Sequence, residues 1–276
     1  MLGQEFSWKT KDQLHIYAKH WKAAKPRAAV CLVHGLGEHV NRYNHVADYF
    51  NEHGFSMLGN DRRGHGQSEG PRGHVPKFED FLTEVEHLLA TAKAHYPNVP
   101  IFLYGHSMGG NIVLNYLIEK RPDIQAAIVT GPWIRLIASP SPLLVQTAKV
   151  MKRIAPKVGK ANELNAKHLS RDPKCCADYE NDPLVHARVT LGMGACMLDA
   201  AKNIDQFSGE LSVPLLAMHG SADQITDPNG TMDFAKRLTS DVTLEIWEGG
   251  YHEIHNDIIK EEVITYMVDW MEQYMQ

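Results

Sequence analysis

A serine lies between two glycines in the segment Gly105-His-Ser-Met-Gly109, directly after the apolar run of residues 99–103. This pattern is typical of a nucleophile elbow, a sharp turn between a strand and a helix that holds the serine in a left-handed backbone conformation. Glycines two residues away on either side let the chain pass closely at such a turn. The segment therefore predicts a strand and a helix joined at Ser107. It also predicts acyl-transfer chemistry, provided that the rest of the chain supplies a base and an acid.

The rest of the chain carries the pattern of an α/β protein. Residues 5–9 and 14–21 alternate in hydrophobicity around a polar turn, which predicts an antiparallel hairpin. After Pro26, short apolar runs alternate with amphipathic stretches, as in a mostly parallel sheet with crossover helices. We therefore expect an eight-stranded sheet flanked by helices, with further strands at 28–33, 55–60, 101–104, 126–130, 213–219 and 242–247, and helices at 42–52, 77–95, 108–120, 230–239 and 258–272.

One long region breaks this alternation. Residues 133–207 are rich in Pro, Lys and Met, show no convincing strand pattern and stand between two predicted strands. A long insertion without the pattern of the sheet is typical of a lid over a site. We expect a core made of residues 1–132 and 208–276, with residues 133–207 as an inserted helical cap.

Within this expected cap, residues 143–160 carry five basic side chains and no acidic one, and their apolar side chains could share one face of a helix. A basic amphipathic helix in an acidic protein suggests contact with a lipid surface, where each Lys or Arg contributes about 1 kcal/mol near anionic lipid. The alternative is a cap helix that packs its apolar side over a pocket and leaves its charges in solvent. The two interpretations are compatible, so peripheral membrane contact through the cap stays a hypothesis.

Composition excludes several classes of protein. The net charge of −5, without a basic face, argues against a nucleic-acid binder. No stretch approaches the roughly 18 apolar residues of a membrane span, and no charged leader precedes an apolar stretch, so we expect a soluble, cytoplasmic protein. The four cysteines lack a metal-ligand spacing and are interpreted as free thiols. His252-Glu-Ile-His255 is one residue too short for the zinc helix motif, so neither a metal nor a cofactor is expected.

A serine hydroxyl is a weak nucleophile until a base accepts its proton and an acid orients that base. Two candidates follow late predicted strands: Asp223 in Gly220-Ser-Ala-Asp223 and His252 in Glu248-Gly-Gly-Tyr-His252. The order Ser, Asp, His along the chain is the one found in α/β-hydrolases. A loop aspartate can instead cap a helix, and a loop histidine can simply be solvated. Three such residues at the right strand ends favour a triad of Ser107, Asp223 and His252.

The transition state also needs donors for the developing oxyanion, and each is worth about 3 kcal/mol. The amide of Met108 follows the nucleophile at the start of a helix, whose dipole adds to the effect. The second donor should come from the loop His34-Gly-Leu-Gly-Glu-His39, where we choose the amide of Leu36. The glycines of that loop permit a close turn, although a tight strand-to-helix connection alone would use them as well.

Six segments carry a resemblance to a known family. They are His34-Gly-Leu-Gly-Glu-His-Val-Asn-Arg-Tyr43, Asp61-Arg-Arg-Gly-His-Gly-Gln-Ser-Glu-Gly70, Gly105-His-Ser-Met-Gly-Gly110, Asn181-Asp-Pro-Leu184, Gly220-Ser-Ala-Asp223 and Tyr251-His252. On these segments the chain resembles the monoacylglycerol lipases, a group of α/β-hydrolases that also includes lysophospholipase-like enzymes. The resemblance covers most of the chain and is weakest across residues 133–207. It implies the α/β-hydrolase fold and the same triad and oxyanion amides.

The resemblance also implies how an alcohol head group is held. The glycerol-contacting acid and arginine of the family fall on Glu38 and Arg42, and its second histidine falls on His255. A carboxylate, a guanidinium and an imidazole can together satisfy the two hydroxyls of a glycerol diol. The alternative for Glu38 and Arg42 is a structural ion pair. Mammalian members carry cysteines where this chain has Thr226, His186 and Met193, so the sequence leaves sensitivity to thiol reagents open.

These patterns predict a serine hydrolase that cleaves monoacylglycerols to glycerol and free fatty acid, with the acyl chain under the cap. A general carboxylesterase and a lysophospholipase remain alternatives, because a triad does not choose the leaving group. A non-catalytic lipid-binding protein on the same fold is an alternative of another class. The sequence leaves the acyl-length preference and the oligomeric state open.

Overall fold

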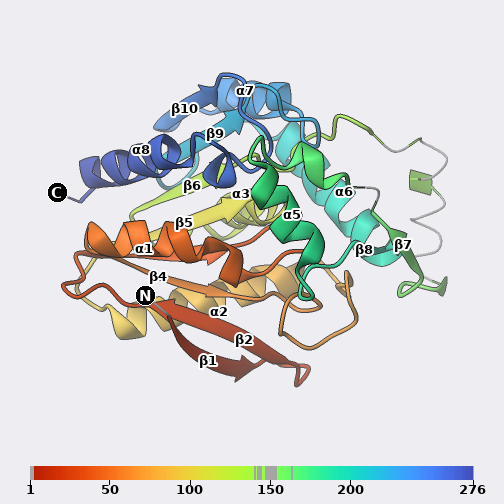
Figure 1. The fold of residues 1–276 in the computed structure, drawn as a ribbon, viewed down its shortest axis with the longest axis horizontal. Coiled ribbons are helices and arrows are strands. Elements are labelled where there is room, and N and C mark those ends of the chain that lie inside the picture. The colour runs from red at the N-terminus through yellow and green to blue at the C-terminus, as the bar shows by residue number, and fades with distance from the viewer. Residues whose placement is uncertain (1–2, 140, 142–144, 147–153, 163, 276) are drawn as a thin grey trace.

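The computed structural model describes residues 3–139, 141, 145–146, 154–162 and 164–275, and its centre is one eight-stranded sheet (Figure 1). The strand order is β1-β2-β4-β3-β5-β6-β9-β10. β1 and β2 form the predicted hairpin, β2 pairs antiparallel with β4, and all later pairings are parallel. The strands are β1 (Gln4–Lys9), β2 (His15–Trp21), β3 (Ala28–Val33), β4 (Phe55–Asn60), β5 (Ile101–His106), β6 (Ala126–Thr130), β9 (Leu215–Gly220) and β10 (Val242–Trp247).

Helices cover both faces of this sheet (Figure 1). One apolar cluster joins the sheet to α1 (Asn44–Glu52), which follows the short helix η1 (Val40–Tyr43), and to α8 (Lys260–Gln273). The other joins it to α2 (Glu79–His95), α3 (Met108–Lys120) and α7 (Pro228–Arg237). Because both faces are covered, the central strands are buried along their whole length, which explains their mostly apolar sequences.

Capping residues set where two helices begin. α7 starts at Pro228, and the side chain of Asp227 accepts a hydrogen bond from the Asn229 amide. Proline at the first helical position lacks only an amide that the helix would leave free, and an aspartate cap satisfies another amide. The predicted start of this helix at residue 230 is therefore two residues late. α5 (Pro173–Asn181) begins in the same way behind Asp172.

The segment between β6 and β9 lies at one end of the sheet, beyond α3 (Figure 1). It contains the helices α5 and α6 (Leu191–Gln206) and the 3-10 turn η2 (Ala166–His168). It also contains a two-stranded sheet of β7 (Gly159–Ala161) and β8 (Arg188–Thr190). The prediction that residues 133–207 hold no strand is therefore wrong, because such short, polar strands carry no recognisable alternation.

The predicted basic helix at 143–160 falls largely outside the described residues, which lack 142–144 and 147–153. Its last part is not helical, since Pro156 and Lys157 form a turn and β7 follows. A proline disfavours the helical conformation of the residue before it and lacks the amide that a helix interior needs, so the helix prediction is wrong beyond Ile154. Within the part of the chain that is described, no helix is long and apolar enough to cross a bilayer.

Candidate active site

Ser107 occupies the turn between β5 and α3 with a φ of 53° and a ψ of −117°. A Cβ atom on Gly105 would lie 2.6 Å from the carbonyl oxygen of Gly109. A Cβ atom on Gly109 would lie 1.9 Å from the carbonyl oxygen of Val33, at the end of β3. Only glycine fits at either position, so the predicted nucleophile elbow is present. The same close approach brings the start of α3 against the loop that follows β3.

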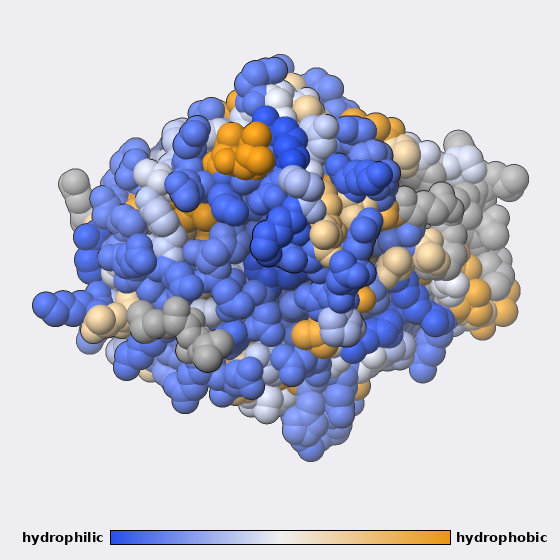
Figure 2. All heavy atoms as spheres, in the orientation of Figure 1, coloured by the Kyte–Doolittle hydropathy of each residue, from blue (hydrophilic) through white to orange (hydrophobic). Residues whose placement is uncertain are grey.

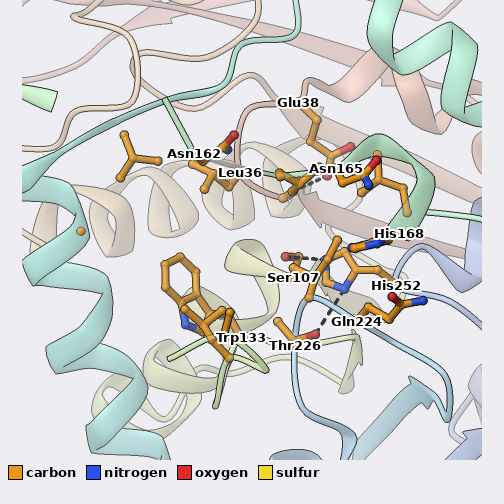
Figure 3. Close-up of a pocket in the computed structure, with 18 of the residues that line it drawn as sticks. Leu36, Glu38, Ser107, Trp133, Asn162, Asn165, His168, Gln224, Thr226 and His252 are labelled. Atoms are coloured by element: carbon orange, nitrogen blue, oxygen red, sulfur yellow. Dashed lines mark hydrogen bonds between the residues drawn. The ribbon is translucent and has the colours of Figure 1, made fainter. Parts of the chain in front are cut away.

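Three side chains from separate strand ends form a hydrogen-bonded line. His252 Nε2 lies 2.9 Å from Ser107 Oγ, and His252 Nδ1 lies 2.7 Å from Asp223 Oδ2. Asp223 follows β9 and His252 follows β10, and all three residues are buried. Figure 3 shows Ser107 and His252 side by side at the wall of a cavity. The geometry is that of a nucleophile, a base and an acid that orients the base.

Asp223 is held by more partners than the sequence reasoning named. Its Oδ1 accepts the amides of Ile225 and Thr226, at 2.7 and 3.1 Å. Its Oδ2 also accepts the hydroxyl of Thr226 at 2.8 Å and lies 3.0 Å from His219 Nε2. Burial alone would raise the pKa of Asp223, but His252 and His219 hold it well below its usual range. The carboxylate therefore stays ionised beside the base.

The electrostatics of His252 follow from this carboxylate. Burial alone would lower the pKa of His252, but the charge and hydrogen bond of Asp223 raise it above its ordinary value. Glu253 and Glu38 contribute in the same direction. An imidazole with a raised pKa is a stronger base toward a serine hydroxyl.

Both predicted oxyanion donors belong to residues near Ser107. Leu36 lines the cavity together with Ser107, and Met108 is the first residue of α3. Within the described chain, neither the Leu36 amide nor the Met108 amide donates a hydrogen bond to another group. Two free amides beside a nucleophile match what an oxyanion requires.

The cavity beside Ser107 has a volume of about 650 Å³, within the usual range for a small-molecule site. Figure 3 shows Leu36, Asn162 and Trp133 bordering the open space in front of Ser107. Most of its described wall is apolar, and much of that wall comes from the segment between β6 and β9: Trp133, Leu136, Leu164, Leu169, Val189 and Leu198. The described wall includes no lysine or arginine and two carboxylates, Glu38 and Glu253.

A buried ion cluster, formed by Glu38, Arg42 and Glu253, stands at the polar side of the cavity and is here called the head-group cluster. Arg42 donates to both oxygens of Glu253 at 2.7 Å and to Glu38 Oε2 at 2.8 Å. Glu38 also accepts the hydroxyl of Tyr43 and the amide of Gly35. Burial raises the pKa of Glu38. Burial alone would also raise the pKa of Glu253, but the charge and hydrogen bonds of Arg42 hold it well below its usual range.

The structure places the three predicted head-group residues differently. Glu38 lines the cavity, whereas Arg42 and His255 do not. The ring of His255 is fully buried, stacks on Tyr43 at 4.9 Å and meets the edge of His106, which does line the cavity, at 4.6 Å. Burial lowers the pKa of His255 well below its ordinary value. This arrangement gives no support to direct contact between a head group and Arg42 or His255.

Sequence reasoning missed Glu253 and His219. Glu253 directly follows His252, and a carboxylate next to a predicted catalytic base is a signal that could have been used. His219 is the second-last residue of β9, and its side chain is fully buried against Asp223. Nothing local in the sequence marks that contact, because it depends on how the loop after β9 turns back.

Comparison with known proteins agrees with this geometry. The sequence profile of the family described as serine aminopeptidase, S33 matches residues 24–259. The chain belongs to this hydrolase family. It is 34% identical over 252 residues to a monoacylglycerol lipase of Mycolicibacterium smegmatis, a match that covers 91% of this chain and 90% of the relative.

Two further relatives extend the comparison. An uncharacterized abhydrolase domain-containing protein of Dictyostelium discoideum is 35% identical over 97% of this chain, which spans only 29% of that protein's length. The crystal structure of a monoacylglycerol lipase from Paleococcus ferrophilus superposes with a TM-score of 0.86 at 31% identity, covering 94% of this hydrolase and 99% of the other chain. The α/β-hydrolase fold and the resemblance to monoacylglycerol lipases are therefore confirmed.

Proposed function

We propose that this hydrolase cleaves monoacylglycerols to glycerol and a free fatty acid through an acyl intermediate on Ser107. The observation that carries the proposal is the hydrogen-bonded line of Ser107, His252 and Asp223, which opens on an apolar cavity bordered by carboxylates. Relatives that cover most of the chain are named monoacylglycerol lipases or monoglyceride lipases.

In acylation, Ser107 Oγ attacks the ester carbonyl carbon while its proton passes to His252 Nε2. The carbonyl oxygen becomes an oxyanion that accepts hydrogen bonds from the amides of Leu36 and Met108. The tetrahedral intermediate then collapses, the bond to the glycerol oxygen breaks, and His252 gives its proton to that oxygen. Asp223 keeps the proton of His252 on Nδ1 and stabilises the imidazolium that forms.

In deacylation, a water molecule takes the place that glycerol has left. His252 Nε2 accepts a proton from this water as its oxygen attacks the acyl carbon, and the same amides hold the second oxyanion. The bond to Ser107 Oγ breaks, and the proton on His252 returns to the serine. The fatty acid leaves, and the enzyme is restored.

The apolar side of the cavity suits the acyl chain, and residues 133–207 supply much of it. We therefore retain the division into a core of residues 1–132 and 208–276 and a cap of residues 133–207 as part of the proposal. The division is not sharp, because Met193 and Met197 of α6 pack into the same apolar cluster as α3.

The polar side of the cavity favours a neutral alcohol. The carboxylate of Glu38 can accept a hydrogen bond from a glycerol hydroxyl, while Arg42 is occupied by two carboxylates and His255 lies behind His106. We assign Arg42 and His255 a supporting role around Glu38 rather than direct contact. A phosphate in this place would meet no lysine or arginine among the described wall residues. This arrangement favours a glycerol ester over a lysophospholipid.

The proposal is tested by comparing three esters of one acyl chain: a monoacylglycerol, a methyl ester and a lysophospholipid. We expect kcat/KM to be highest for the monoacylglycerol, and Glu38→Gln to reduce that preference over the methyl ester. Equal values for all three substrates would favour a general carboxylesterase. A preference for the lysophospholipid would reverse the assignment of the alcohol.

Peripheral membrane contact through the cap is a further part of the proposal. Ile137, Ile154 and Val158 of the cap are 53%, 74% and 54% exposed, and Figure 2 shows apolar atoms at that end of the molecule. Exposed apolar side chains next to basic ones suit the surface of an anionic bilayer. Co-sedimentation with anionic vesicles should weaken in Ile154→Ser together with Val158→Ser. Binding that is unaffected by this double variant would argue against contact through the cap.

A further inference from the structure

A buried arginine behind the loop of Leu36 has no part in the mechanism described so far. Arg62 follows β4, and only 1% of its surface is exposed. No carboxylate in the described chain pairs with Arg62, whereas its neighbour Arg63 pairs with Glu84 at 2.5 Å. Burial lowers the pKa of Arg62 to about 10, so the guanidinium stays charged at neutral pH. A buried cation without a partner anion is unfavourable, so its presence calls for an explanation.

The guanidinium is directed at two consecutive carbonyl groups of the loop after β3. One Nη atom donates to the carbonyl oxygen of His34, and the other donates to the carbonyl oxygen of Gly35 at 2.8 Å. The ring of Phe81 covers the guanidinium at 5.7 Å. The backbone amide of Arg62 also donates to His34 Nε2 at 3.1 Å. Arg62 thus holds both the backbone and the side chain of the residue that opens the loop.

The Gly35 carbonyl belongs to the same peptide group as the Leu36 amide. In a planar trans peptide the C=O and N–H bonds point in opposite directions. A carbonyl drawn toward Arg62 therefore turns the Leu36 amide the other way. Gly35 and Leu36 both line the cavity, and Figure 3 shows Leu36 at its edge. His34 Nδ1 donates to the same carbonyl oxygen at 2.9 Å. Donors on a carbonyl polarise its peptide group and strengthen the N–H as a donor.

The carbonyl of His34 links the second oxyanion donor, the Met108 amide, to Arg62. A Cβ atom on Gly109 would lie 2.6 Å from this carbonyl oxygen, so the first turn of α3 rests directly on it. Met108 stands immediately before Gly109. The guanidinium of Arg62 therefore fixes the loop that carries the Leu36 amide. It also fixes the His34 carbonyl, against which the first turn of α3 with the Met108 amide packs.

We propose that Arg62 is a positioning residue of the oxyanion hole, which aims and polarises the Leu36 amide through the Gly35 carbonyl. The inference rests on the proposed function, in which Ser107 forms a tetrahedral oxyanion. Arg62 does not touch the substrate and acts through the backbone. Its loss should weaken binding of the transition state more than binding of the ground state.

The test compares Arg62→Lys with Arg63→Lys, a matched replacement of an adjacent buried arginine that does not contact the loop. Two ligands with the same alkyl chain distinguish binding of the transition state from binding of the ground state. A trifluoromethyl ketone adds Ser107 Oγ at its carbonyl carbon, the serine proton passes to His252, and the ketone oxygen becomes an oxyanion. A 1-O-alkylglycerol ether has no carbonyl and makes no use of the hole.

We expect Arg62→Lys to lower kcat by about 10- to 100-fold, below the 10²- to 10³-fold loss typical of deleting a donor outright, with KM changed by less than about threefold. Affinity for the trifluoromethyl ketone should fall by a similar factor, and affinity for the ether should change by less than about threefold. Arg63→Lys should keep kcat within about threefold of wild type at a comparable thermal midpoint.

Three results would overturn the proposal. Arg62→Lys could retain both kcat and ketone affinity, or it could lose affinity for both ligands equally. The third result is that Arg62→Lys and Arg62→Gln both fail to fold under conditions in which Arg63→Lys folds. That result would assign Arg62 a structural role. If the ketone failed to inhibit the wild-type enzyme, or inhibited Ser107→Ala equally well, the proposed function itself would fail and this inference with it.

Discussion

The triad and the head-group cluster both contain buried charged side chains, but these charges are paired differently in the two sites. In the triad, Asp223 orients His252, and the line ends at Ser107 Oγ, which faces the cavity. In the head-group cluster, the guanidinium of Arg42 is shared between two carboxylates and does not line the cavity. One arrangement can move a proton to and from a substrate, whereas the other holds two carboxylates in fixed positions.

This difference shows that residue identity does not fix a residue's role. Glu38 and Arg42 occupy the positions that the resemblance to monoacylglycerol lipases implies, yet Arg42 donates two hydrogen bonds to Glu253 and only one to Glu38. Damage to the triad should therefore appear in the rate of catalysis. Damage to the head-group cluster should appear first in stability and in pH dependence.

The largest effect is expected for Asp223→Asn. An asparagine amide directed at His252 Nδ1 favours the tautomer with its proton on Nε2, which cannot accept the proton of Ser107. We expect kcat to fall by about 10⁴-fold, measured by steady-state hydrolysis of a monoacylglycerol. Asp227→Asn is the matched control, because asparagine also caps α7 and kcat should stay within about twofold. Equal kcat values for the two variants would remove Asp223 from the triad.

The head-group cluster is tested by Arg42→Met. Removal of the guanidinium leaves Glu38 and Glu253 buried without a cation, which should reduce the free energy of unfolding by about 3–5 kcal/mol in urea denaturation at neutral pH. The control is Arg27→Met, which breaks a pair with Glu272 whose side chains are 52% and 43% exposed. That change should cost less than about 1 kcal/mol. Similar losses in both variants would show that burial does not distinguish the cluster from a surface ion pair.

The smallest effect is expected in the pH dependence of kcat/KM. The enzyme needs neutral His252, and its neighbouring carboxylates raise the pKa of this histidine, so activity should fall with decreasing pH at a midpoint above 6.5. Glu253 is one of these carboxylates, so Glu253→Gln should lower the pKa of His252 and move the midpoint to lower pH. The exposed Glu248→Gln should leave it unchanged. A midpoint for Glu253→Gln that moves upward, or that matches the control, would contradict this electrostatic account.

Much of the core was predictable from sequence for a physical reason. Parallel strands buried on both faces are mostly apolar, so the predicted strands at 28–33, 55–60 and 126–130 coincide with β3, β4 and β6. The predicted strand at 242–247 coincides with the half-buried edge strand β10, whose sequence alternates between apolar and polar residues. The geometry of Ser107, Asp223 and His252 could be anticipated as well, because each of the three follows a strand of one sheet.

The remaining features depend on contacts between distant segments. β7 and β8 have three residues each and pair across a gap of more than twenty residues, so neither carries a local pattern. Arg42 and Glu253 are 211 residues apart, and no local pattern shows that they meet. The contact between Arg62 and the Gly35 carbonyl likewise exists only once β3 and β4 lie side by side.

The central claim is that Ser107 carries the acyl group of a monoacylglycerol while glycerol leaves. The most direct measurement is the release of glycerol from a monoacylglycerol by the wild-type enzyme, Ser107→Ala and the exposed control Ser139→Ala. We expect wild type and Ser139→Ala to release glycerol at the same rate, and Ser107→Ala to be slower by about 10⁴-fold or more. Glycerol release by Ser107→Ala well above background would contradict the account.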